Sequence, residues 1–266
     1  MESLRSSDLK LARRLEAAEA ANAFSMARAG GFETEAIAGG CAVFAGVDSP
    51  MTHALGCGLS GTVNAGDIER LEQFFFARGS DCLIDVCPMA DFGLVQAVMD
   101  RGYSIIEFNN LMVRRLSPID SEWTCAGVQL EPVVDATRSE WLQLMAECFE
   151  VPLEVLENIP AYGVVMMTRL GGKLAAAAGM SSEAGVALLS GDATLPVSRG
   201  LGLQGVLIRE RIARAARAGC ELAMACVLPG SGSHRNYERA GFQLVYMRVN
   251  VKRPCPQAGS TAGNGG

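Results

Sequence analysis

A glycine-rich turn ahead of a long amphipathic helix is the stretch of this sequence best suited to bind an anion. It reads Val197-Ser198-Arg199-Gly200-Leu201-Gly202-Leu203-Gln204 and follows Leu195-Pro196. Two glycines spaced by one residue let the backbone turn tightly and approach a ligand closely. The first amides of the next helix lack intrahelical partners, and with the positive end of the helix dipole they suit a pyrophosphate. Arg199 adds a positive charge to this predicted site.

The same glycines also satisfy a dinucleotide fingerprint, G-x-G-x-x-G, through Gly200, Gly202 and Gly205. That fingerprint requires its first glycine directly after a buried strand and an acidic residue about 20 positions later. Here residues 194–199 separate the last strand-like residue from Gly200, and Glu221 falls at the start of the next strand. The spacing therefore argues against a nicotinamide or flavin site.

The elements around the turn follow from periodicity. After it, apolar residues recur every three or four positions up to Gly219, which predicts one buried helix face, while Arg209, Arg211, Arg214 and Arg217 fall largely elsewhere. An apolar run at 220–227, a short helix through Ala240 and a strand at 243–251 come next.

With these elements the sequence resembles the GCN5-related N-acetyltransferase (GNAT) superfamily. The superfamily marks its acyl-coenzyme A site with Q/R-x-x-G-x-G/A, which residues 197–202 match except for Val197 at the first position. A second motif, roughly N-x-x-A-x-x-L-Y-x-x-x-G-F, is matched at residues 237–242. Gly230, Ser233 and Asn236 stand where that motif has Asn, Ala and Leu.

The resemblance implies acetyl-coenzyme A as the cosubstrate and an amine of a small molecule or peptide as the acceptor. The strand around Thr194-Leu195 would pair with the pantetheine arm, and a backbone amide there would polarise the thioester carbonyl. Tyr237 matches the tyrosine that protonates the departing thiolate. The implied coenzyme-binding residues are Thr194, Leu195, Val197, Arg199, Gly200, Leu201, Gly202, Leu203, Gln204 and Ser233.

The general base is less clear from the sequence. Asp192, at the end of the strand that leads to the turn, is the candidate we assign, and Glu183 is the alternative. Either carboxylate could instead be a solvated cap, His234 could be exposed and inert, and Tyr237 could be a half-buried aromatic. The sequence therefore leaves two classes of function open: an N-acyltransferase, or a non-catalytic protein that binds acyl-coenzyme A.

An internal repeat predicts two copies of one α/β fold, each a mixed central sheet flanked by helices. Gly79 to Gly102 spans 23 positions and Gly219 to Gly241 spans 22, with helix, strand, proline and helix in the same order. We expect a degenerate GNAT-like domain at 1–120, an acetyl-coenzyme A-binding domain at 121–254 and a disordered tail at 255–266. Asp67 is expected to cap the first copy's helix, so its carboxylate would occupy the amides that a phosphate needs. The first domain would then shape the acceptor pocket.

The composition and charge of the chain argue against several other classes of protein. The net charge of −6 argues against a nucleic-acid partner, and no apolar run approaches a membrane span. Charges throughout the first thirty residues argue against a signal peptide and for a cytoplasmic location, with a surface helix at 8–29 capped by Ser6 or Ser7. Nine cysteines form no C-x-x-C pair, so we expect reduced core thiols, as at Cys82 and Cys226, and no metal site. The oligomeric state cannot be read from the sequence.

Overall fold

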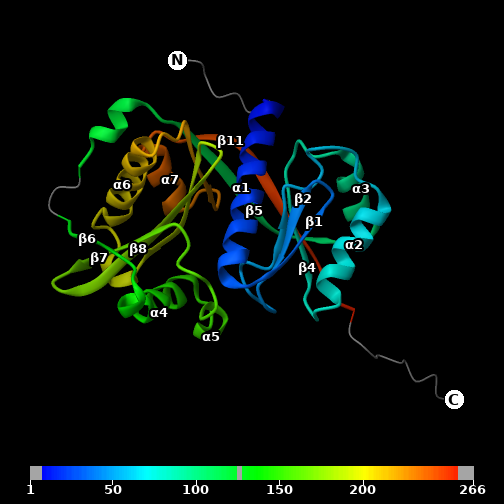
Figure 1. Cartoon of the computed structure of the whole chain (residues 1–266), viewed down its shortest axis with the longest axis horizontal. Coiled ribbons are helices and arrows are strands. Elements are labelled where there is room, and N and C mark those ends of the chain that lie inside the picture. The colour runs from blue at the N-terminus through cyan, green and yellow to red at the C-terminus, as the bar shows by residue number, and fades with distance from the viewer. Residues whose placement is uncertain (1–7, 125–127, 257–266) are drawn as a thin grey trace.

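One mixed sheet runs through both halves of the chain (Figure 1). The computed structural model describes residues 8–124 and 128–256, and their eleven strands lie in the order β1-β2-β3-β4-β11-β5-β10-β9-β8-β7-β6. The strands are β1 (Glu33–Ile37), β2 (Gly40–Phe44), β3 (His53–Leu55), β4 (Cys82–Val86), β5 (Ser104–Arg115), β6 (Leu130–Pro132), β7 (Val164–Leu170), β8 (Lys173–Glu183), β9 (Val186–Thr194), β10 (Leu222–Val227) and β11 (Gln243–Arg253). The helices are α1 (Leu9–Gly30), α2 (Ala65–Phe76), α3 (Phe92–Asp100), α4 (Arg138–Phe149), α5 (Leu153–Leu156), α6 (Leu203–Arg217) and α7 (Gly232–Arg239), with short 3-10 turns η1 (Pro118–Glu122), η2 (Asp135–Thr137) and η3 (Pro196–Ser198).

Each half of the chain ends in a strand that pairs with the other half. β5 lies between β11 and β10 and is antiparallel to both, while β11 lies between β5 and β4. The segments α2-β4-α3-β5 and α6-β10-α7-β11 have the same order of elements, as the repeat in the sequence predicted. The division into domains at 1–120 and 121–254 stays a prediction, and residues 257–266 of the expected tail lie outside the described residues. The topology shows that strands of the two halves alternate in the middle of the sheet: β11 of the second half lies between β4 and β5 of the first, and β5 lies between β11 and β10.

Helices cover both faces of this sheet. α1 crosses the middle of one face (Figure 1), where it clusters with Leu222 and Met224 of β10. Ala223 and Ala225 of the same strand cluster with α6 and α7 instead. Because successive side chains of a strand point to opposite faces, α1 lies on one face and the α6–α7 pair on the other.

The same alternation places the remaining helices. α4 packs on Ala177 of β8, whereas α6 packs on the neighbouring residues Ala176 and Ala178. α4 therefore shares the face of α1. In the first half, α1 packs on Val43 of β2 while α2 and α3 pack on Ala42, so α2 and α3 share the face of α6.

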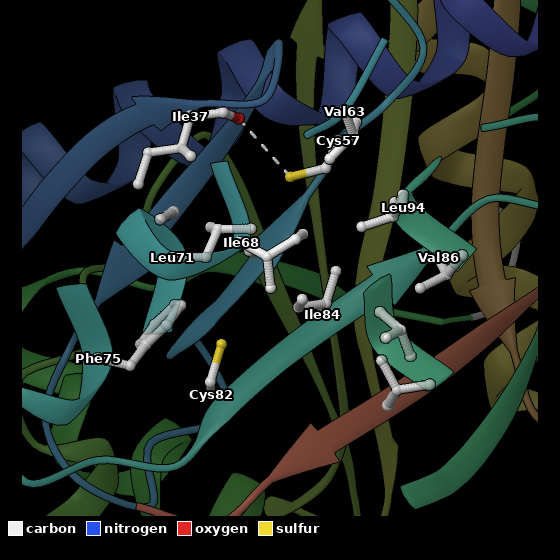
Figure 2. Packing of buried hydrophobic residues seen from close by; sticks show 14 of the residues in the cluster. Ile37, Cys57, Val63, Ile68, Leu71, Phe75, Cys82, Ile84, Val86 and Leu94 are labelled. Carbon is white, nitrogen blue, oxygen red and sulfur yellow. Dashed lines mark hydrogen bonds between the residues drawn. The ribbon is translucent and has the colours of Figure 1, made fainter. Parts of the chain in front are cut away.

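The core beneath α2 and α3 holds the first half together. Figure 2 shows Leu71 and Phe75 of α2, Leu94 of α3 and Ile84 of β4 in one buried cluster. The Cys57 thiol at its edge lies 3.7 Å from the carbonyl oxygen of Ile37. Free cysteines in such surroundings behave as small apolar residues, and Cys82 does so in the same cluster, as the sequence predicted.

The start of α1 differs from the sequence expectation. Asp8 is its N-cap, because its carboxylate accepts a hydrogen bond from the backbone nitrogen of Leu11 at 3.0 Å. The expected cap by Ser6 or Ser7 is therefore wrong. The end agrees, since Gly31 adopts a left-handed φ of 70° and terminates the helix.

A buried ion cluster ties α1 to β11. Arg248 donates to Oε1 of Glu16 at 2.8 Å and is ion-paired with Glu19 as well. Tyr246 donates to the same Oε1 at 2.8 Å. Burial raises the pKa of Glu16, although the neighbouring Arg248 guanidinium acts to lower it. The cluster fixes the last strand of the chain under its first helix.

We expect Arg248→Met to lower the free energy of unfolding by about 3–5 kcal/mol, because it leaves the buried carboxylate of Glu16 and the partly buried one of Glu19 without their cation. Arg70→Met is the matched control, since Arg70 forms an exposed pair with Glu35 whose nitrogen–oxygen distance is 2.6 Å. The control should cost less than about 1 kcal/mol. Urea unfolding measures both; equal losses would show that the buried cluster contributes no more than a surface pair.

Candidate functional site

The glycine turn before α6 leaves a row of backbone N–H groups free. Gly200 and Gly202 have φ angles of 79° and 77°, in the left-handed region that favours glycine. Gly202 is the N-cap of α6 and offers no side chain to the helix. Within the described residues, the amides of 203–205 have no hydrogen-bond partner, and the first amide that has one is Val206, which donates to the carbonyl of Gly202 at 3.2 Å. This end of α6 can therefore bind an anion.

The side chains of the turn divide between solvent and core. Val197 is 90% exposed, and Leu201 is exposed beside it. Leu203 is buried in the cluster between α6 and β8, so only its backbone is available to a ligand. Arg199 is exposed, and its Nε donates to the carbonyl of Thr194 at 3.3 Å.

Two further residues of the predicted site contact each other. Gln204 at the start of α6 donates through Nε2 to the hydroxyl of Ser233 in α7 at 2.8 Å. Its Oε1 accepts from the side-chain Nδ2 of Asn236 at 2.8 Å. These hydrogen bonds hold the first turns of α6 and α7 side by side.

β9 and β10 diverge next to this turn. The two parallel strands pair only at Leu222–Met224 with Val186–Leu188, although β9 continues to Thr194 and β10 to Val227. On its other side β9 remains paired with β8, and the amide of Leu195 donates to the carbonyl of Ala175 at 2.9 Å. Since neighbouring residues of a strand direct their amides to opposite sides, the backbone of Thr194 faces the gap. An extended ligand can pair with β9 there.

A bulge sets Asp192 apart from its neighbours. The β8–β9 register shifts between the pairs Ala177–Ala193 and Gly179–Ser190, so two residues of β9 stand opposite one of β8. Gly191 in the bulge has a left-handed φ of 64°. Such bulges re-aim a side chain, and here the side chain is Asp192.

Asp192 forms a triad with the fully buried side chains of Tyr237 and Arg211. The Tyr237 hydroxyl donates to Oδ2 of Asp192 at 2.6 Å, and Arg211 donates to Oδ1. Arg211 Nη2 also lies 3.3 Å from the Tyr237 oxygen. Burial is the largest cause of a pKa for Tyr237 well above its usual range; Arg211 opposes that shift and Asp192 adds to it. The phenol is therefore protonated at neutral pH.

Arg211 is the residue of this triad that the sequence analysis missed. It was expected on the polar side of its helix, yet it is 0% exposed. Its Nη1 donates to the carbonyls of Gly179 and Ser190 at 3.0 and 3.3 Å, so it bridges β8 and β9 at the bulge. The sequence did contain a sign of this burial. Arg211 lies three residues after Ile208 and four before Ala215, so it shares the helix face of these two buried residues.

The other candidate bases lie elsewhere or are engaged. Glu183 is at the β8–β9 hairpin, at the opposite end of β9 from Thr194, and accepts a hydrogen bond from Ser25 at 3.1 Å. His234 accepts from the backbone amide of Gly230 through Nδ1 at 3.0 Å, which makes it part of the loop before α7. Glu183 is therefore remote from the gap between β9 and β10, and the Nδ1 of His234 is engaged in the loop that follows β10.

The corresponding turn of the first half is closed. Asn64 caps α2, and its Oδ1 accepts from the amides of Gly66 and Asp67 at 2.9 and 3.2 Å. Asp67 returns a hydrogen bond by accepting from the amide of Asn64 at 3.0 Å. The expected cap by Asp67 is wrong in detail, because the cap is Asn64 and Asp67 completes a capping box. The amides of this turn are nonetheless occupied.

In residues 8–124 and 128–256, no group of three or more His, Cys, Asp or Glu side chains is placed to hold a metal ion. None of the helices described here is long and apolar enough to cross a membrane.

Comparison with solved structures identifies the fold. The chain has the fold of GCN5-related N-acetyltransferases. Over 94% of this chain and 97% of the other it superposes on a GCN5-related N-acetyltransferase from Kribbella flavida with a TM-score of 0.69 at 18% identity. A putative acetyltransferase of the GNAT family from Novosphingobium aromaticivorans matches over 73% and 80% of the two chains, with a TM-score of 0.51 at 20% identity.

A protein with two such units in tandem is also similar. The tandem GNAT protein from the clavulanic acid biosynthesis pathway matches 73% of this chain and 69% of its own, with a TM-score of 0.53 at 15% identity. No protein-family model and no curated protein matches the sequence. At these identities the likeness shows the fold alone.

Proposed function

We propose that the chain is an N-acyltransferase that transfers the acetyl group of acetyl-coenzyme A to an amine of a small molecule or peptide by direct attack. One arrangement supports this proposal. The free backbone amides of α6 lie beside the gap between the parallel strands β9 and β10, and the hydrogen-bonded pair Tyr237–Asp192 lies at the same gap. The pyrophosphate would lie on the amides of 203–205, with Arg199 and Gln204 next to it. The pantetheine arm would extend along β9 at Thr194.

The chemistry requires one proton to leave the amine and one to reach the sulfur. A neutral amine attacks the thioester carbonyl, the new C–N bond forms and the C–S bond breaks. Asp192 takes the proton from the amine nitrogen, directly or through water. Tyr237 gives its proton to the departing thiolate.

The 2.6 Å hydrogen bond between Tyr237 and Asp192 connects these two transfers. A thiol titrates near pH 8.5, and the pKa of Tyr237 lies well above 10, so proton transfer from phenol to thiolate alone is uphill. Asp192, once protonated by the amine, can return a proton to Tyr237 as the latter protonates the sulfur. Arg211, 3.3 Å from the phenol oxygen, stabilises negative charge there during the exchange. The net result is transfer of one proton from nitrogen to sulfur.

A non-catalytic acyl-coenzyme A-binding protein is the second candidate. The observation in its favour is that Tyr237 is 0% exposed and already hydrogen-bonded, which also suits a structural role. Thiol release from acetyl-coenzyme A in the presence of a panel of primary amines, with the product identified by mass, separates the two. A transferase releases coenzyme A only with an acceptor and forms the acetylated amine. Tight binding without product with any amine would support the second candidate.

We expect one coenzyme A to bind per chain, because the first amides of α2 are occupied by Asn64 whereas those of α6 are free. Calorimetric titration of the full-length chain gives the stoichiometry directly. A value of two would show that the first half also binds the coenzyme.

A further inference from the structure

The gap between β9 and β10 opens on the face of α1 as well as on that of α6. Cys226 follows Ala225 on β10, beyond the last residue that pairs with β9. Ala225 and Val227 cluster with Tyr237, so Cys226 points to the opposite face, that of α1. Its side chain is exposed there, which corrects the expectation of a core thiol. The gap is therefore open at Cys226 on the face of the sheet opposite α6.

Charged groups of α1 and β11 lie beside Cys226. The Nη1 of Arg248 is 3.5 Å from the Cys226 sulfur, and the same guanidinium is paired with Glu16 and Glu19. Two carboxylates face one cation, so the cluster carries an excess negative charge when both are ionised. Glu19 has 22% of its side chain exposed, so solvent and ligands reach it.

Hydrogen-bond acceptors outnumber donors along this part of α1. Glu16 is 1% exposed, and its Oε2 is buried without a hydrogen-bond partner in the described residues. The buried Oδ1 of Asn22 has no partner there either. Glu16, Glu19 and Asn22 follow one another at three-residue spacing, which places them on one stripe of the helix. A buried oxygen without a donor destabilises the fold, so the stripe favours a ligand that brings N–H groups.

We propose that this stripe binds a cationic group of the acceptor, so that the substrate is an amine with a second basic nitrogen. The inference rests on the proposed transferase function and names its substrate class. The nitrogen held by Glu16, Glu19 and Asn22 cannot be the one that attacks, because neighbouring carboxylates favour its charged form and the attack needs a lone pair. One nitrogen therefore stays protonated on α1 while the other enters the gap between β9 and β10.

Matched acceptors test the inference with the full-length protein. Wild type should acetylate 1,4-diaminobutane with a kcat/KM at least about tenfold higher than butylamine, which corresponds to about 1.4 kcal/mol. Glu19→Gln should remove that preference and leave coenzyme A affinity unchanged. Glu33→Gln is the control, because Glu33 forms an exposed ion pair with Arg78 on β1, at the far edge of the sheet.

A second variant and a binding measurement keep the test independent of any folding defect. Asn22→Asp adds a carboxylate to the same stripe and should increase the preference for the diamine. Direct calorimetric binding of 1,4-diaminobutane to the coenzyme A complex of wild type should be detectable where butylamine is not. Equal rates and equal binding of the two amines would overturn the inference and leave the transferase intact. Binding of coenzyme A without transfer to any amine would instead contradict the proposed function.

Discussion

Tyr237→Phe is expected to lower kcat for acyl transfer by about a hundredfold or more while coenzyme A affinity changes little. The ring remains in place, packed edge-to-face on Phe242 with 4.9 Å between centroids, so the cavity keeps its shape. What is lost is the proton for the thiolate and the donor to Asp192. Steady-state kinetics with acetyl-coenzyme A and a good acceptor measure the effect.

Tyr103→Phe is the matched control for this change. Tyr103 also donates to a carboxylate, Glu72 at 3.3 Å, but in the first half of the chain. Its removal should cost some stability and leave kcat unchanged. If Tyr237→Phe keeps the wild-type rate, Tyr237 is structural.

The hydrogen bond between Tyr237 and Asp192 leads to a further prediction about these two residues. Because Asp192 and Tyr237 act through one hydrogen bond, the double variant Asp192→Asn/Tyr237→Phe should be about as slow as the slower single variant. Separate roles would instead multiply the two losses. Coenzyme A affinity, measured in parallel, shows whether each variant retains the donor site.

Gly202→Glu is expected to weaken coenzyme A binding by well over tenfold. The backbone at this position has a φ of 77° and open space where a Cβ would be, so the chain can accommodate a side chain at a modest strain. The new carboxylate would lie where the pyrophosphate must approach the amides of α6, and like charges repel.

Gly171→Glu provides the control because it imposes the same strain elsewhere. Gly171 has a φ of 56° and equally open surroundings, between β7 and β8. Its substitution should leave the dissociation constant unchanged. Equal losses of affinity in the two variants would mean that the effect is one of stability and not of the turn.

The turn and the repeat could be predicted from the sequence because both depend on local signals. Glycines at Gly200 and Gly202 need left-handed φ angles, and the apolar period of α6 is visible without tertiary information. The capping of α2 in the first half could also have been predicted from the sequence, because Asn64 and Asp67 have the spacing of a capping box.

Other features depend on contacts between distant parts of the chain. The pairing of β5 with β10 and of β11 with β4 follows from how the two halves meet, which periodicity within one half does not specify. Arg211 looks like a surface residue until β8 and β9 supply carbonyls and Asp192 supplies a charge to bury it. The exposure of Cys226 likewise depends on where β9 leaves β10.

A crystal structure of the full-length chain with coenzyme A tests the central claim most directly. We expect one molecule per chain, with its pyrophosphate on the backbone amides of 203–205, its pantetheine arm along β9 at Thr194 and its sulfur next to the hydroxyl of Tyr237. A pyrophosphate bound away from α6, or a sulfur outside the gap between β9 and β10, would contradict it.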